Sequence, residues 1–239
     1  MLGQPHSSCS QLRRSASRAL GVAGLCLVAV SGCTSSLVNY ESITHVVQSG
    51  ETLYAIAWRY GLDHQDLAAW NHLNNPDLIY VGQRLSLRSS GSARSAQASS
   101  PPEQSRPLPP PPTAPPPTWQ WPTKGGVVRT FGADDGLGNG IGIGGSRGQT
   151  IHAAASGRVV YSGNGLIGYG QLLIIKHNDT YLSAYGHNNR LIVKQGDSVE
   201  RGQAIARMGV GPEQRPQLHF EIRRNGSPVD PLRYLPRQS

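Results

Sequence analysis

The sequence predicts two folded domains, a small βααβ module and a mainly β C-terminal domain built on an antiparallel sheet. Residues 44–88 contain two strand patterns around two short helical patterns, while residues 119–239 contain alternating apolar runs separated by glycine-rich turns. Residues 89–118 are rich in serine, alanine and proline, a composition that cannot bury a core. We therefore expect a disordered Pro-rich linker between the two domains.

Residues 1–32 have the features of a secretory signal peptide. Arg13, Arg14 and Arg18 supply a positive start, and residues 19–30 form an apolar run that is too short to span a membrane as a mature helix. We expect this segment to be removed on export. The mature chain would then carry a net charge of +5, from 19 basic and 14 acidic residues.

The apolar run ends in Val30-Ser31-Gly32-Cys33, which resembles a bacterial lipobox. In a lipobox the cysteine is lipidated and becomes the new N-terminus, so residues 33–43 would form a lipidated tether. An ordinary signal peptide followed by an incidental cysteine is the alternative. Cys33 would be the only cysteine of an exported chain, and lipidation explains a thiol that has no disulfide partner. Thr34, in place of the aspartate that retains lipoproteins at the inner membrane, favours the outer membrane.

The βααβ module can be followed residue by residue. A strand is predicted at residues 45–47 and a closing strand at residues 83–87. The first helix places Leu53, Ile56, Ala57 and Tyr60 on one face after a capping Thr52, and Gly61 ends it. Asp63 is predicted to cap the second helix, which continues to about Leu73. At helical spacing, Trp58 and Trp70 are predicted to be core residues rather than sugar platforms.

Two motifs in this module resemble those of LysM modules, which bind the N-acetylglucosamine-containing glycan of peptidoglycan. The first is V-x-x-G-E-T-L-x-x-I-A from Val47, and the second is N-x-L-x-x-P-x-x-I-x-x-G-Q-x-L from Asn71. The resemblance implies a sugar groove between two loops, whose residues are Gly50, Glu51, Thr52 and Leu53 in the first and Pro76, Asp77, Leu78 and Ile79 in the second.

Ten of the eighteen prolines lie between Pro101 and Pro117. Such a run favours extended polyproline II, so we interpret residues 89–118 mainly as a semi-rigid spacer. A ligand for proline-recognition domains is the alternative.

The C-terminal domain is predicted to contain at least seven strands. They are expected near residues 127–128, 141–143, 157–161, 172–176, 181–185, 191–193 and 218–222. From Trp119 onward the chain has 14 basic and 8 acidic residues, a net charge of +6. This charge suits an acidic partner or peptidoglycan carboxylates, although a merely solvated surface explains it equally well. Export and the lack of nucleic-acid motifs argue against nucleic acid.

The segment from about Trp121 to Pro236 resembles the LytM-type (M23) zinc endopeptidases, which cut peptidoglycan cross-bridges. In that family an H-x-x-x-D motif supplies two zinc ligands and a late H-x-H supplies a catalytic histidine and the third ligand. Here the first pair falls on Gly138 and Gly142, and the late motif reads Gln217-Leu218-His219. Because glycine has no side-chain donor, the resemblance implies no zinc, no cofactor and no catalytic residue. Asp134 and Asp135 could in principle substitute, but they precede a Gly-rich loop.

We predict instead that the degenerate site is a partner groove. The residues assigned to it are Gly138, Gly142, Tyr185, His187, Gln217 and His219. His187 falls on the family's other catalytic histidine. A hydrogen-bonded His187–His219 pair that is retained only for its packing is an equally good interpretation.

The combination of a lipobox, a LysM module and a degenerate LytM domain resembles the NlpD-type cell-division lipoproteins. The stretches that carry this resemblance are Tyr161–Gly170, Leu172–Asn178, Tyr181–Asn188 and Val229–Pro236. Members activate periplasmic N-acetylmuramoyl-L-alanine amidases, so the resemblance implies an outer-membrane, periplasm-facing amidase activator of septal wall splitting. Gly142 departs from members that retain the aspartate. A residual zinc endopeptidase and a non-activating wall tether are the alternatives.

Overall fold

The computed structural model describes residues 44–88, 114–133 and 138–238. The predicted signal peptide, Cys33, the tether, most of the linker, and Asp134 and Asp135 lie outside these ranges. In the part that is described, no helix has the length and apolarity needed to cross a membrane.

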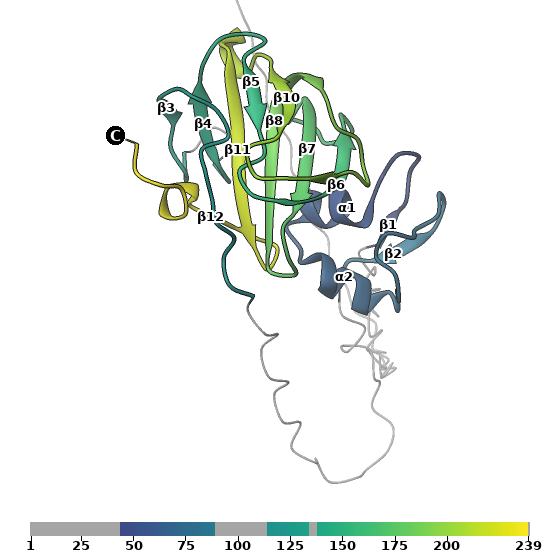
Figure 1. The fold of residues 1–239 in the computed structure, drawn as a ribbon. Coiled ribbons are helices and arrows are strands. Elements are labelled where there is room, and N and C mark those ends of the chain that lie inside the picture. The colour runs from purple at the N-terminus through teal and green to yellow at the C-terminus, as the bar shows by residue number, and fades with distance from the viewer. Residues whose placement is uncertain (1–43, 89–113, 134–137, 239) are drawn as a thin grey trace, which may run out of the picture. The chain divides into compact units, whose positions relative to one another are not determined.

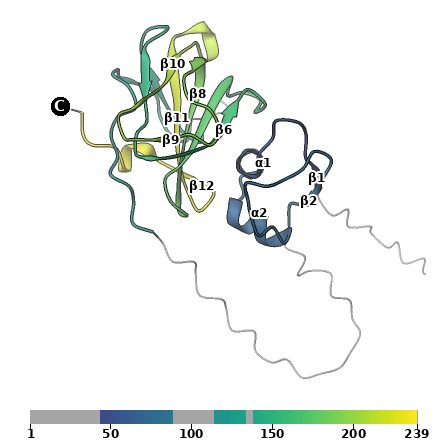
Figure 2. The same ribbon diagram turned by 45° about the vertical axis from the view of Figure 1, so that its right-hand side comes forward.

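The N-terminal module has the predicted βααβ order. Its elements are β1 (Thr44–Val46), α1 (Leu53–Tyr60), α2 (His64–Trp70) and β2 (Arg84–Ser86). The two strands pair antiparallel, with His45 opposite Leu85, and Figure 2 shows them beside the two helices. Leu53, Ile56, Leu67 and Leu85 form the centre of its apolar core, and all four are fully buried.

Both helix starts are capped as predicted. The Thr52 side chain accepts a hydrogen bond from the Ala55 amide, and the Asp63 carboxylate accepts one from the Gln65 amide. Gly61 ends α1 in the left-handed conformation, at a φ of 65°.

One prediction for α1 is wrong. Tyr60, expected on the buried face, is 43% exposed, and its hydroxyl lies 3.1 Å from His45 Nδ1. It closes the last turn of the helix, where an amphipathic ring can leave the core and keep its hydroxyl in water. Trp58 is a buried core residue, as predicted, and it belongs to a second apolar cluster with Tyr54 and Ala55. Trp70 packs partly buried against the module's apolar core.

The C-terminal domain is an antiparallel sheet in which β3, β4, β11, β8, β7, β6 and β9 lie side by side in that order (Figure 1). The bounds of its strands are β3 Val127–Arg129, β4 Ile141–Gly144, β5 Thr150–His152, β6 Gly157–Gly163, β7 Gln171–Lys176, β8 Tyr181–Leu191, β9 Ser198–Val199, β10 Ala204–Met208, β11 Gln217–Arg224 and β12 Ser227–Val229. Two 3₁₀ turns, Pro212–Gln214 and Pro231–Arg233, complete the described elements.

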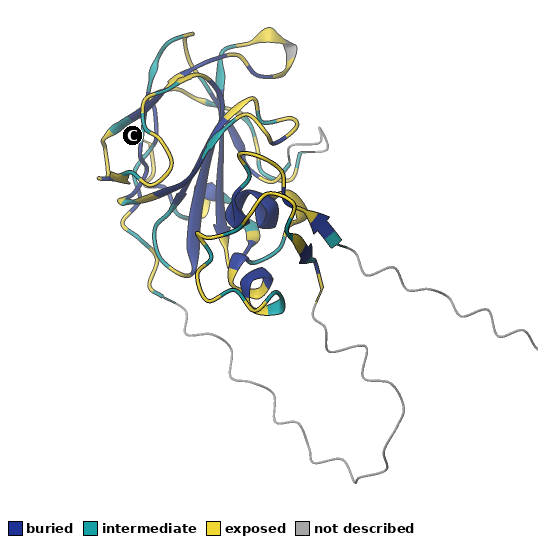
Figure 3. Cartoon of the chain, turned by 90° about the vertical axis from the view of Figure 1, so that its right-hand side faces the viewer, coloured by how far each residue is buried: buried dark blue, intermediate teal, exposed yellow. Residues whose placement is uncertain are grey.

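One face of this sheet forms the domain core. Along β11, Leu218, Phe220 and Ile222 point into an apolar cluster, together with Ile141 and Ile143 of β4. All five are fully buried, and the central strands are accordingly dark blue in Figure 3. Because side chains alternate along a strand, His219, Glu221 and Arg223 of β11 point to the opposite face. The candidate site lies on that face.

Some predicted boundaries differ from the structure. Residues 191–193 are not a separate strand, since Leu191 is the last residue of the long strand β8. The short strands β5, β9, β10 and β12 were not predicted. At the end of the predicted linker, the Ala114 amide donates a hydrogen bond to Thr180 Oγ1, so the chain contacts the C-terminal domain before Trp119.

Candidate functional site

Three adjacent strands place Arg129, Gly142 and His219 in one row across the sheet. Arg129 of β3 pairs with Gly142 of β4, and Gly142 pairs with His219 of β11. Directly paired residues lie on the same face of an antiparallel sheet, so the Arg129 and His219 side chains flank the bare backbone of Gly142. The structure therefore places two of the predicted groove residues, Gly142 and His219, side by side. It adds Arg129, which the sequence analysis missed.

A side chain at either of the glycines at the former ligand positions would be crowded. A Cβ at Gly138 would lie 2.4 Å from the Ala133 carbonyl oxygen. One at Gly142 would lie 2.9 Å from Gln217 Oε1 and 3.0 Å from the Arg129 Cβ. Gln217 occupies the first histidine position of the H-x-H motif. Its side-chain amide lies against Gly142, in the space that a ligand side chain at position 142 would need.

His219 lies at the centre of a buried polar network. Its Nδ1 accepts a hydrogen bond from Arg129 Nη2, and its Nε2 lies 2.7 Å from Glu221 Oε1. A guanidinium can only donate, so Nδ1 is the unprotonated nitrogen and Nε2–H donates to the carboxylate. His219 and Glu221 are both fully buried.

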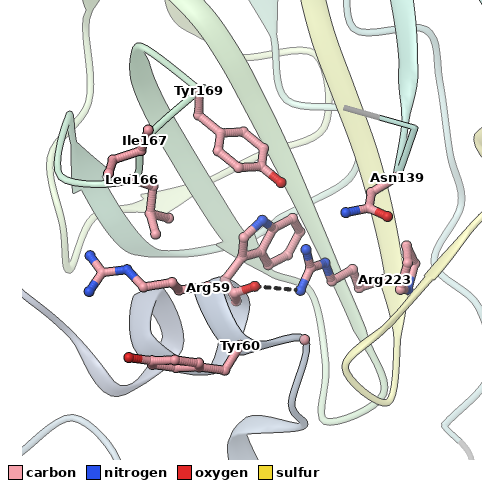
Figure 4. A pocket seen from close by; sticks show the side chains of 10 residues that line it. Arg59, Tyr60, Asn139, Leu166, Ile167, Tyr169 and Arg223 are labelled. Carbon is pink, nitrogen blue, oxygen red and sulfur yellow. Dashed lines mark hydrogen bonds between the residues drawn. The ribbon is translucent and has the colours of Figure 1, made fainter. Parts of the chain in front are cut away.

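Glu221 stays ionised although it is buried. Burial raises the pKa of its carboxyl group, but the hydrogen bond from His219 and the positive charge of Arg223 outweigh burial and lower it. Arg223 Nε lies 3.3 Å from Glu221 Oε2. Tyr169 donates its hydroxyl to Glu221 Oε1 at 2.8 Å, and burial, followed by the Glu221 charge, raises the pKa of this hydroxyl to about 12. Figure 4 shows the side chains of Tyr169, Asn139 and Arg223 in close-up.

His187 faces the same site from β8. Its ring centroid lies 5.8 Å from that of His219. Burial, followed by the neighbouring His219 and the positive Arg129, lowers the pKa of His187 to about 4, so its imidazole is neutral at pH 7. Among the described residues, none forms a hydrogen bond with its buried Nε2.

Tyr185 is not a groove residue. It is fully buried in the core cluster, its ring centroid lies 5.4 Å from that of Phe220, and its hydroxyl accepts a hydrogen bond from the Ala154 amide at 2.9 Å. Regular alternation would put Tyr185 and His187 on one face. His187 has a φ of 59°, in the left-handed region, which interrupts the alternation and separates the two side chains.

The two predicted sugar loops of the N-terminal module differ in exposure. Leu53 is fully buried in the core, Thr52 caps α1, and Glu51 is held by His45 Nε2 and Arg59 Nη1, each at 2.6 Å. In the second loop Leu78 is 52% exposed, and the neighbouring Tyr80 and Val81 are 63% and 71% exposed. Apolar groups are therefore accessible mainly around the second loop.

Comparisons with known proteins agree with this architecture. Residues 45–88 match the LysM domain, and residues 136–231 match Peptidase family M23. The lipoprotein NlpD/LppB homolog of Pseudomonas aeruginosa is 39% identical over 229 residues, covering 81% of this chain and 77% of that protein. The chain belongs to the NlpD/LppB family of lipoproteins.

Two further matches show the range of this similarity. The murein hydrolase activator NlpD of Escherichia coli K12 is 38% identical over 263 residues, covering 84% of this chain and 69% of that protein. A zinc-containing peptidase from Vibrio cholerae has 28% identity and a TM-score of 0.43, covering 47% of this chain and 39% of that one.

The described residues of this NlpD/LppB-type chain do not fit the zinc ion that Peptidase family M23 implies. A catalytic zinc takes about three protein ligands and an open position. In the ranges that the structure describes, no group of three or more His, Cys, Asp or Glu side chains could hold a metal ion. The lone pair of His219 Nδ1 is taken by the Arg129 guanidinium, and Gln217 fills the space above Gly142.

Proposed function

We propose that this protein is a non-hydrolytic activator of a periplasmic N-acetylmuramoyl-L-alanine amidase. The observation that carries the proposal is the guanidinium of Arg129 beside His219 and above Gly142, in a family whose E. coli relative is named a murein hydrolase activator. A cation of this kind cannot lower the pKa of a bound water to ~7, as a catalytic zinc does. The remaining role for the site is to hold a partner protein.

The activator would act by shifting a conformational equilibrium of the amidase. The NlpD-type resemblance implies that the degenerate groove engages the amidase and moves an autoinhibitory segment away from the amidase active site. Moving that equilibrium from 1:99 to 99:1 requires that the open form be bound ~5.5 kcal/mol more tightly than the closed form. Gln217 is well placed for such a contact, because it is half-buried at the start of β11 and lies over Gly142.

The remaining parts of the chain would place this activity at the septal wall. The LysM module would bind glycan through backbone groups of residues 50–53 and through the exposed loop at residues 76–79, including Leu78. Acetamido groups need polar partners beside small apolar walls, which this combination supplies. A lipid on Cys33 would anchor the chain to the periplasmic face of the outer membrane, since several acyl chains hold far better than one.

The experiment that tests this proposal mixes the purified chain from residue 34 onward with a cognate amidase and dye-labelled peptidoglycan. We expect the chain alone to release no dye and to raise the amidase rate well above its own level. Release that stays at the amidase-alone rate would refute activation.

A matched pair of variants tests the groove itself. Gln217→Lys places a long charged side chain over Gly142 and is expected to reduce activation by about tenfold, which corresponds to ~1.4 kcal/mol of lost binding. Gln203→Lys makes the same change at an exposed turn outside the site and should activate like wild type. Equal activation by both variants would place the partner surface elsewhere.

A further inference from the structure

The side chain of Arg129 depends on the absence of a side chain at Gly142. The two residues are direct cross-strand partners, and a Cβ at Gly142 would lie only 3.0 Å from the Arg129 Cβ. Cβ atoms this close force one backbone or the other to move. A side chain at position 142 would therefore crowd the Arg129 side chain, which now lies beside bare backbone.

The Arg129 guanidinium reaches across Gly142 to the nitrogen that would otherwise face a metal. Its Nη2 donates to the Nδ1 of His219. The opposite nitrogen, Nε2, donates to Glu221 Oε1 at 2.7 Å. Metal-ligating histidines usually have this arrangement, in which a carboxylate holds one ring nitrogen and thereby aims the other at the ion. Glu221 therefore holds the His219 ring as it would hold a metal ligand. The Nδ1 lone pair that would bind the metal instead accepts a hydrogen bond from an N–H group of Arg129.

We propose that Arg129 is the built-in cation of this site: a positioning residue that stands in place of a divalent metal ion, holds His219 in one tautomer and keeps metal out. A guanidinium is always charged in proteins, so this cation is permanent. One of its planar donors points at the lone pair of His219 Nδ1. The inference concerns metal exclusion and does not rest on amidase activation.

The test compares zinc and cobalt binding by the wild-type chain, Arg129→Ala and the matched control Arg190→Ala. Arg190 lies near the exposed end of β8, so its removal changes the net charge equally but leaves the site intact. Metal is titrated while the ring nitrogens of His219 are followed by NMR of ¹⁵N-histidine-labelled protein. Cobalt absorbance gives an independent readout of the coordination.

We expect the wild type and Arg190→Ala to show no metal-dependent change at His219, and Arg129→Ala to bind at least about tenfold more tightly. The new binding should use the neutral imidazoles of His187 and His219, and should disappear in Arg129→Ala/His187→Ala. Wild-type His219 that responds to zinc as strongly as the variant would overturn the proposal. So would an Arg129→Ala protein that is folded and gains no metal response.

A second variant keeps the proposal testable if Arg129→Ala does not fold. Arg129→Met retains much of the side-chain volume and removes the donor. The proposal predicts that the Nδ1 resonance of His219 moves toward that of an imidazole nitrogen without a hydrogen bond, while Nε2 stays protonated. An unchanged Nδ1 resonance would show that Arg129 does not hold this nitrogen. Dye release measured with the same variants separates this result from any failure of amidase activation.

Discussion

At the scale of single residues, Gly142 is closely packed between the side chains of Gln217 and Arg129. Gly142→Ala would bring a Cβ to 2.9 Å from Gln217 Oε1 and 3.0 Å from the Arg129 Cβ. Overpacking of this kind costs roughly 1–3 kcal/mol. We expect the urea midpoint of the C-terminal domain to fall accordingly. Gly126→Ala is the matched control, because a Cβ there meets nothing within 4 Å, and equal stability of the two variants would contradict the crowded geometry.

The sequence could identify part of this site and not the rest. Gly138 and Gly142 could be found because they occupy the two ligand positions of the H-x-x-x-D motif. Gln217 and His219 could be found because they occupy the two histidine positions of the H-x-H motif. Arg129 was missed because it reaches the site only through the pairing of β3 with β4, which brings it opposite Gly142. The partner of a residue in a neighbouring strand cannot be deduced from a local sequence motif. Tyr185 was assigned to the wrong face because the left-handed φ at His187 cannot be read from the residue type.

A second prediction at this scale concerns the pH dependence of stability. His177 Nδ1 lies 2.8 Å from the Ser156 carbonyl oxygen and Nε2 lies 2.7 Å from Ser183 Oγ. Burial lowers the pKa of His177 to about 4, and the hydrogen bond to Ser156 only partly opposes this. The unfolded chain, with a pKa near ~6.5, binds a proton more readily. Stability from this residue is therefore complete above pH ~6.5 and is lost as the pH falls toward 4, by up to roughly 3 kcal/mol.

Urea unfolding at pH 7, 5.5 and 4 measures this effect. His177→Asn stays neutral throughout, so its stability should fall less steeply with pH than that of the wild type. Parallel curves for the two proteins would show that His177 is not buried in its neutral form.

At the scale of elements, the first helix of the LysM module depends on its cap. Thr52 accepts a hydrogen bond from the Ala55 amide at 3.0 Å. Its removal in Thr52→Ala should cost ~1 kcal/mol, which lowers the protection of the α1 amides in hydrogen exchange by about fivefold. Thr52→Ser retains the acceptor and should exchange like wild type. If serine and alanine exchange alike, the cap does not hold the helix.

The regular elements were predictable because each has a local signal. Apolar or alternating runs of strand length marked β4, β6, β7 and β11, and the caps marked both helices. Strand β9 has two residues, and β5 and β12 have three each, which is too short for a periodic pattern. The strand β10 has a register shift against both of its neighbours, so its alternation is broken as well.

At the scale of the whole molecule, the proposal assigns wall binding and activation to different domains. Deletion of residues 44–88 should abolish co-sedimentation with peptidoglycan sacculi while leaving amidase activation in solution intact. Leu78→Asp, which places a charge in the exposed second loop, should weaken sedimentation without affecting activation. If removing residues 119–239 left cell separation normal, the simple wall-tether alternative would explain the protein better.

The most direct measurement identifies which bond is broken when the chain, the amidase and unlabelled sacculi are incubated singly and together. Mass spectrometry of the products distinguishes glycan freed of its stem peptides from peptides whose cross-bridges are cut. We predict no products from the chain alone, and with the amidase an increase only in glycan freed of peptide. Cut cross-bridges produced by the chain alone would contradict the assignment of Arg129 to the place of a metal.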